Sequence, residues 1–133
     1  MAGYVASATE RDLKKVPRAR GTYMAVLIGE EDGAPHFAKR RFVLEPGGRI
    51  PAHFHPDIEH EQYVMRGEMT MGLDDETVTA KAGDVVFIPA KTVHWYQNDG
   101  DAPCEFLCTV PITEDYETEW LETLEGEALG VRP

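Results

Sequence analysis

PAHFHPDIEHEQYVMRGE, residues 51–68, is the stretch that decides the fold, because it holds three of the five histidines of the chain. His53 and His55 are two residues apart, so on a β-strand both side chains leave the same face. The short turn PDIE separates them from His60, which opens the next strand-like segment. His94 follows much later, in KTVHWYQND, at the start of another strand. Neighbouring strands that deliver imidazole to one interior face predict a shared metal ion.

Short strand-like segments continue on both sides of this stretch. They alternate apolar and polar residues or, as in DVVFIPA, are continuously apolar, and Pro, Gly and Asp separate them. About nine such segments, spaced roughly 8–12 residues apart, predict a β-sandwich or barrel. The predicted strands cover residues 22–29, 36–48, 49–55, 60–68, 68–75, 76–84, 84–90, 93–101 and 104–111.

Composition narrows the range of functions. The 133 residues suit one domain, and 42 % hydrophobic residues suffice for a core. A formal net charge of −11 argues against a nucleic-acid partner, which would need a basic face. Two basic runs, residues 11–20 and 39–41, are interpreted as solvated turn and strand positions. No apolar run approaches the roughly 20 residues of a membrane span, and no signal peptide is recognised, so a cytoplasmic protein is expected.

Only the acidic C-terminal part is predicted to be helical. Its apolar residues recur at i, i+4, i+5 and i+8, the spacing of a stripe along one helix face. These residues are Tyr116, Trp120, Leu121 and Leu124. We therefore expect a short acidic helical tail over about residues 113–127, packed on the barrel or on a partner subunit.

The two cysteines lie on one predicted strand. On an extended chain the Cα atoms of Cys104 and Cys108 would lie about 13 Å apart, which is too far for a disulfide. Two reduced thiols are therefore expected. Spacing of four places both on the same face as Phe106, where they belong either to the core or to a pocket wall.

Two motifs resemble those of the cupin family. GGRIPAHFHPDIEHEQYVMRG resembles the first motif, G(X)5HXH(X)3–4E(X)6G, and GDVVFIPAKTVHWYQN resembles the second, G(X)5PXG(X)2H(X)3N. The second motif is matched in register by Gly83, Pro89, His94 and Asn98. Lys91 stands where that motif has its second glycine. The resemblance, over about residues 37–111, implies an all-β double-stranded β-helix, the cupin jelly-roll barrel. It implies a single domain over residues 1–133, with the barrel core at about 22–111.

The resemblance also implies a metal site. Its ligands would be His53, His55, His60 and His94. The family's usual set is three His and one Glu, but six residues counted back from Gly67 select His60 for the Glu position. Glu59 stays open as a rival ligand. In each ligand histidine the ring nitrogen that does not bind the metal needs a hydrogen-bond partner, and Glu59, Glu61 and Asn98 are the candidates.

Four neutral imidazoles would leave a divalent ion its full charge, which suits a carbonyl, an enolate or a carboxylate. Imidazole is compatible with Fe, Mn, Zn, Ni or Cu. Strand parity predicts the residues that line the pocket with the metal: Gln62, Val64, Tyr96, Phe106 and Cys108. His36, the histidine outside both motifs, is either a general acid/base at the cavity mouth or a surface turn residue.

Three function classes agree with these features. A metal-dependent oxygenase acting on an enolisable or anionic small molecule is slightly favoured by the resemblance. A non-redox polyketide cyclase or isomerase with a zinc-type centre is the alternative, and a non-catalytic small-ligand binder is the third. An enzyme is favoured over a binder. The resemblance further implies a homodimer, paired through sheet edges or swapped terminal strands, because the edge of residues 22–29 would need cover.

Overall fold

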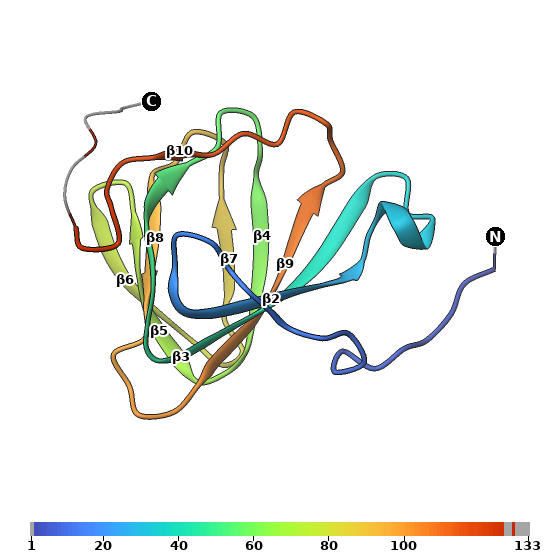
Figure 1. Cartoon of the computed structure of the whole chain (residues 1–133), viewed down its shortest axis with the longest axis horizontal. Coiled ribbons are helices and arrows are strands. Elements are labelled where there is room, and N and C mark those ends of the chain that lie inside the picture. Colours follow the sequence, from blue (N-terminus) through green and yellow to red (C-terminus); the bar gives the residue numbers. More distant parts are fainter. Residues whose placement is uncertain (1, 127–128, 130–133) are drawn as a thin grey trace.

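The computed structural model describes residues 2–126 and residue 129, and its regular structure is almost entirely β (Figure 1). In this part of the chain one 3₁₀ turn, Glu30–Asp32, interrupts the strands. The strands are β1 (Lys14–Lys15), β2 (Arg20–Ile28), β3 (Phe37–Phe54), β4 (His60–Arg66), β5 (Glu68–Leu73), β6 (Glu76–Lys81), β7 (Val85–Ile88), β8 (His94–Gln97), β9 (Cys104–Pro111) and β10 (Glu119–Trp120). The all-β prediction is confirmed.

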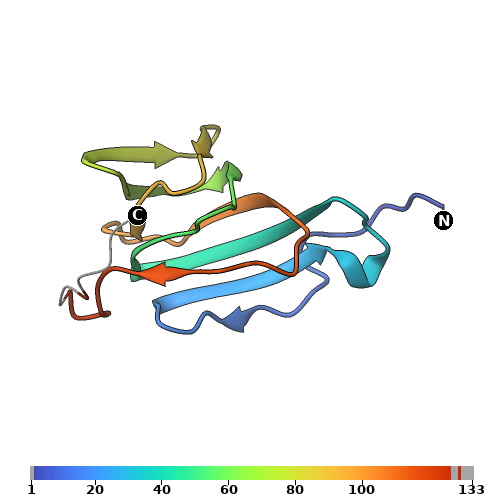
Figure 2. The same cartoon turned by 90° about the horizontal axis from the view of Figure 1, so that it is seen from above.

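These strands form one antiparallel sheet that curls into a nearly closed barrel. Their order is β6-β5-β8-β3-β9-β4-β7, and β2 and β10 pair with β3 as well. Seen from above, β2, β3 and β9 lie in one layer and the β5–β6 hairpin lies in another (Figure 2). This arrangement agrees with the expected jelly-roll barrel.

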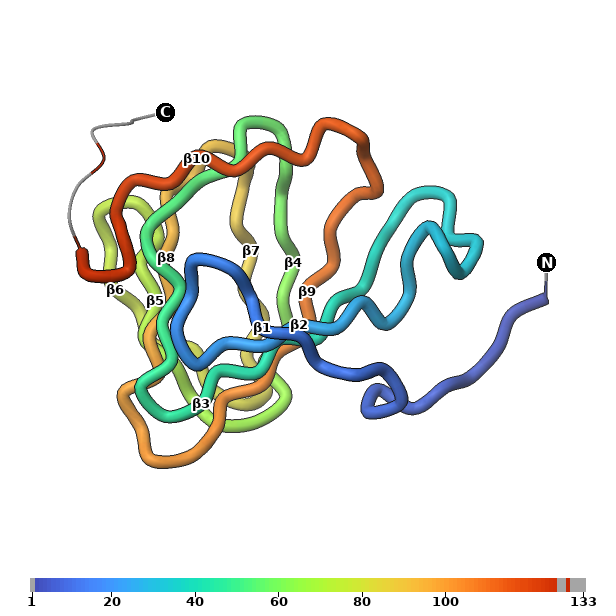
Figure 3. Tube along the Cα trace, viewed as in Figure 1, coloured from blue at the N-terminus to red at the C-terminus, as the bar shows by residue number. Residues whose placement is uncertain are grey.

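Strand β3 differs from the prediction, which had two strands separated by a turn at Pro46-Gly47-Gly48. One long strand runs through this site and changes partners: its first half pairs with β2 and β9, its second half with β8 and β10. The bend is visible in the chain trace (Figure 3). Gly47 has a φ of +81°, and a Cβ on Gly48 would lie 2.8 Å from the Glu45 carbonyl oxygen. Glycine therefore lets the strand bend without ending it.

The core forms where alternate side chains of the strands face the barrel interior. Its largest fully buried apolar side chains include Leu44, Val64, Met69, Met71, Ile88 and Phe106. Both cysteines are free and buried, as predicted, and burial raises the pKa of Cys104 to about 11. Lys91, at the position of the motif glycine, has a φ of +70°. The turn therefore has the left-handed conformation that favours glycine, which explains why the motif has a glycine at this position.

The predicted C-terminal helix is wrong, because the described part of the tail forms strand β10 and a turn at residues 124–125 and contains no helix. Strand β10 pairs with β3 through Glu119↔Phe54 and Trp120↔His53. The Leu121 amide then donates to the Ala52 carbonyl at 2.9 Å. Backbone pairing at the rim and burial of Trp120 against the barrel outweigh the helical spacing. Residue 127, the last of the predicted tail, lies outside the described residues.

None of the helices in the described residues is long and apolar enough to cross a membrane.

Candidate metal centre

The histidines of the two motifs line a single cavity in the barrel interior. One ligand atom each from His53, His55 and His94 lies within 4.8 Å of the others. His53, near the end of β3, is the register partner of His94, the first residue of β8. His60 begins β4, and its ring centroid lies 4.8 Å from that of His55 and 5.4 Å from that of His94. Three of the predicted ligands therefore cluster, and the fourth ring lies beside them.

Backbone carbonyls fix the orientation of three of these rings. The Nδ1 atoms of His53, His55 and His94 lie 2.7, 2.9 and 2.9 Å from the carbonyl oxygens of Pro51, Glu117 and Thr92. A carbonyl can only accept, so each Nδ1 carries the proton and donates it. Each Nε2 then keeps its lone pair, which is the tautomer that a metal ligand needs.

His60 has a different neighbour. Its Nδ1 lies 3.4 Å from the Sγ of Cys108, and its Nε2 is buried without a hydrogen-bond partner among the described residues. The His60 side chain is 2 % exposed. A buried ring nitrogen without a partner is unfavourable unless a ligand or an ion satisfies it.

Burial keeps all four imidazoles neutral. It lowers the pKa of His94 to about 4, although the hydrogen bond to Thr92 opposes the shift. Burial also lowers the pKa of His53, His55 and His60, and the charge of Arg40 lowers that of His60 further. At neutral pH these rings therefore offer lone pairs rather than protons to the cavity.

The cavity has a volume of about 130 Å³, and the C-terminal segment closes one side of it. Of the predicted lining residues, Gln62, Tyr96 and Phe106 line it, whereas Val64 and Cys108 are fully buried in the core behind it. Tyr116, Thr118 and Trp120 cover it from the tail. Their contribution was missed because the tail was predicted as a helix. The cavity is small beside the roughly 300–1,000 Å³ of pockets for drug-sized ligands.

Arg40 was also missed, since the run 39–41 was interpreted as solvated. Arg40 lines the cavity, and its Nε atom is buried without a hydrogen-bond partner in the described part of the chain. Strand parity could have found it, because Arg40 lies two residues before Phe42, another cavity residue, on β3. Arg41 faces the other way and forms an ion pair with Glu105.

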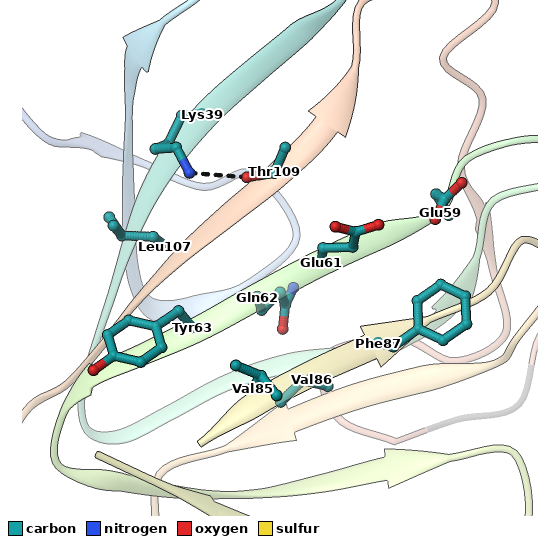
Figure 4. A pocket seen from close by; sticks show the side chains of 10 residues that line it. All are labelled: Lys39, Glu59, Glu61, Gln62, Tyr63, Val85, Val86, Phe87, Leu107 and Thr109. Carbon is teal, nitrogen blue, oxygen red and sulfur yellow. Dashed lines mark hydrogen bonds between the residues drawn. The ribbon is translucent and has the colours of Figure 1, made fainter. Parts of the chain in front are cut away.

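The carboxylates flanking His60 lie outside the barrel. Glu59 and Glu61 are exposed and line an open hollow of about 730 Å³ on the outer face, together with Tyr63, Val85 and Phe87 (Figure 4). The rival ligand Glu59 therefore lies on the opposite face from His60. Neither glutamate holds a ring nitrogen.

The remaining predicted site residues also lie away from the cavity. Asn98 is fully buried, but its amide donates to the carbonyls of Leu44 and Ala102 and so fixes a loop. His36 is exposed before β3 and does not line the cavity. Of the two roles left open for His36, this position agrees with a surface turn residue, and the acid/base role stays a prediction.

The residues present fit a divalent transition metal. Three clustered imidazoles with free Nε2 atoms, and a fourth buried Nε2 without a described partner, form a nitrogen donor set typical of such ions. The residues that could hold the metal are His53, His55 and His94, with His60 beside them. No acidic side chain lines the cavity in the described residues, so the donors add no negative charge.

Comparison with known proteins identifies the family. The model of the Cupin domain family matches residues 40–110, which is more than half of the chain. The chain belongs to the cupin family. The fold and both motifs described above agree with this membership.

Individual relatives include enzymes. The crystal structure of the polyketide cyclase RemF from Streptomyces resistomycificus is 32 % identical, with a TM-score of 0.77 over 86 % of this chain and 89 % of that one. A predicted oxalate decarboxylase from Thermotoga maritima is 25 % identical, with a TM-score of 0.74 over 83 % of this chain and 100 % of that one. The polyketide synthase CurC of Streptomyces cyaneus is 37 % identical over 57 % of this chain. The chain spans 47 % of the length of CurC, and it spans less than two thirds of the length of two other curated relatives that it matches.

Proposed function

We propose that this chain is a metal-dependent enzyme that activates the carbonyl group of a small enolisable substrate, without redox chemistry. One observation carries the proposal: the buried Nε2 of His60 has no partner among the described residues and belongs to the same cavity as three imidazoles with free Nε2 atoms. A cation held by His53, His55, His60 and His94 would satisfy all four nitrogens. The neutral donors would leave it its full positive charge.

Cyclisation of a polyketide or isomerisation is the reaction class that we favour. The similarity to RemF extends over most of both chains, which supports a cyclase more than the oxygenase expected from the sequence. The cavity of about 130 Å³ takes a small molecule or the reacting end of a longer one.

The metal would supply Lewis-acid polarisation of the substrate carbonyl. The side chains around it keep water out, since Phe42, Phe106 and Trp120 line the cavity with apolar rings. Tyr96 holds a proton there: burial raises the pKa of its hydroxyl, and the Gln62 Nε2 donates to its Oη at 2.8 Å. The Tyr96 O–H is thus free to donate to an oxygen on which negative charge develops.

Proton exchange tests this proposal directly. The zinc-loaded protein is incubated with a 1,3-dicarbonyl compound in D₂O, and loss of the methylene proton signal is followed by NMR. Exchange faster than in buffer, unchanged when oxygen is removed, is the expected result, and His94→Ala should abolish it. No exchange, together with oxygen consumption by the iron-loaded protein, would instead favour the oxygenase.

A further inference from the structure

The cavity carries a cationic side chain that the proposed metal chemistry does not use. Arg40 lines it, and no Asp or Glu side chain does so in the described residues. None of the four ion pairs found there includes Arg40. Its neighbour Arg41, on the other face of β3, is paired with Glu105, which also pairs with Arg66. A guanidinium beside a buried cavity is unfavourable without an anionic partner.

The surroundings of Arg40 engage part of its guanidinium, which also interacts with the Tyr116 side chain, and leave its Nε–H unpartnered among the described residues. The guanidinium carbon lies 5.1 Å from the ring centroid of Phe42 and 5.5 Å from that of Tyr116, so aromatic rings pack on it. One Nη lies 3.5 Å from the Cys108 Sγ, a weak acceptor. The Nε–H is buried without a partner in the described structure. The N–H donors of a guanidinium lie in its plane, so this free N–H suits a planar carboxylate.

Gln62 supplies a hydrogen-bond acceptor in the same cavity, as the counterpart of the Arg40 donor. Its side chain is 4 % exposed, and its Nε2 donates to the Tyr96 Oη at 2.8 Å and to the Cys108 Sγ at 3.4 Å. These contacts turn the Oε1 away from both, and it has no partner among the described residues. A buried amide oxygen of this kind calls for an O–H or N–H donor.

We propose that Arg40 and Gln62 form a substrate-anchoring subsite for a carboxylic acid that also carries a hydroxyl or enol O–H. The carboxylate accepts from the Arg40 Nε–H, and the O–H donates to the Gln62 Oε1. The inference deepens the proposed function, on which it rests, by assigning the substrate to the oxo and hydroxy acids. The volume of about 130 Å³ restricts it to a small acid or to the acidic end of a larger molecule.

The test compares an acid with its neutral isostere. Acetoacetate and acetoacetamide are titrated by calorimetry into metal-free protein prepared with a chelator, so that only side chains select between them. Acetoacetate should bind about 10-fold tighter or more, because a hydrogen bond to a charged group is the difference. Arg40→Gln should remove this preference and Arg40→Lys should retain part of it. Lys39→Gln, which removes an equal charge from the exposed outer face, should leave it unchanged.

A second measurement uses the wild-type protein and so does not depend on the folding of a variant. The ¹⁵N–¹H signal of the Arg40 Nε should move on addition of acetoacetate and stay in place with acetoacetamide. Equal affinities for the two compounds in wild type, a preference that persists in Arg40→Gln, or an unmoved Nε signal would overturn the subsite. If the metal-free protein prefers acetoacetate but the zinc-loaded protein catalyses no proton exchange, the subsite stands and only the metal-dependent reaction is rejected.

Discussion

The two faces of strand β4 carry opposite chemistry. Toward the cavity it presents His60 and Gln62, both buried and both uncharged. Toward the outside it presents Glu61 and Tyr63, and Glu59 precedes it on the same outer side (Figure 4). Since side chains alternate along a strand, a shift of one residue in register would exchange an imidazole for a carboxylate in the cavity. Strand register thus decides how much positive charge a metal in this cavity would keep.

Removal of single side chains from the two faces gives the largest expected contrast. His60→Ala should weaken zinc binding by about 100-fold or more, because it removes a direct donor. Glu59→Ala should leave the zinc affinity within about twofold. Competition with a chromophoric chelator measures both. Loss of zinc in Glu59→Ala with retention in His60→Ala would mean that the outer carboxylate, not the imidazole, is the ligand.

The next contrast is the pH dependence of stability, which arises from the buried histidines of the cavity. The folded-state pKa of His94 is about 4, below the ordinary value of about 6.5 that it regains on unfolding. The unfolded chain therefore binds more protons between these values, so the metal-free protein should lose stability as the pH falls from about 6.5 to 4. Each such histidine contributes at most about 1.36 kcal/mol per pH unit. Urea unfolding at several pH values measures the slope, which His94→Gln should reduce; an unchanged slope would contradict the assigned burial.

Cys108 offers a smaller test on the same face. Its Sγ occupies, beside His60, the place that a backbone carbonyl takes for the other three rings. Cys108→Ala should lower zinc affinity by about 10-fold through loss of that orientation, and Cys108→Ser should recover part of it. Chelator competition again provides the measurement. Identical affinities in wild type and Cys108→Ala would remove the sulfur from any positioning role.

Substitutions on the outer face of the barrel should have the smallest effect on metal binding. Val85 and Phe87 are 80 % and 59 % exposed there, and exposed apolar groups of this size suit contact with another chain. The homodimer expected from the sequence stays a prediction, and the double variant Val85→Ser, Phe87→Ser examines it by light scattering. We expect a lower mass than wild type with zinc affinity unchanged; a strictly monomeric wild type would contradict the dimer.

Local patterns predicted most of the barrel but not its rim. Alternation placed His60, Gln62 and Val64 inward, and the two motifs identified the histidines, because strand parity is a local property. The tail was missed because Trp120 is fixed by pairing with His53 of β3, a contact invisible to helical spacing. Arg40 was missed because its charge suggested solvent, although its parity with Phe42 pointed inward. The hydrogen-bond partners of the histidine Nδ1 atoms were predicted wrongly, because they are mostly backbone carbonyls, which no side-chain pattern reveals.

The most direct test of the central claim observes the histidine rings themselves. Long-range ¹H–¹⁵N NMR of the zinc-loaded protein reports, for each ring, which nitrogen carries the proton and which one binds the ion. We predict that His53, His55, His60 and His94 are all protonated at Nδ1 and shifted at Nε2 by zinc, while His36 is unaffected. Spectra in which zinc leaves the His60 ring unchanged, with only three rings shifted, would contradict the four-histidine centre.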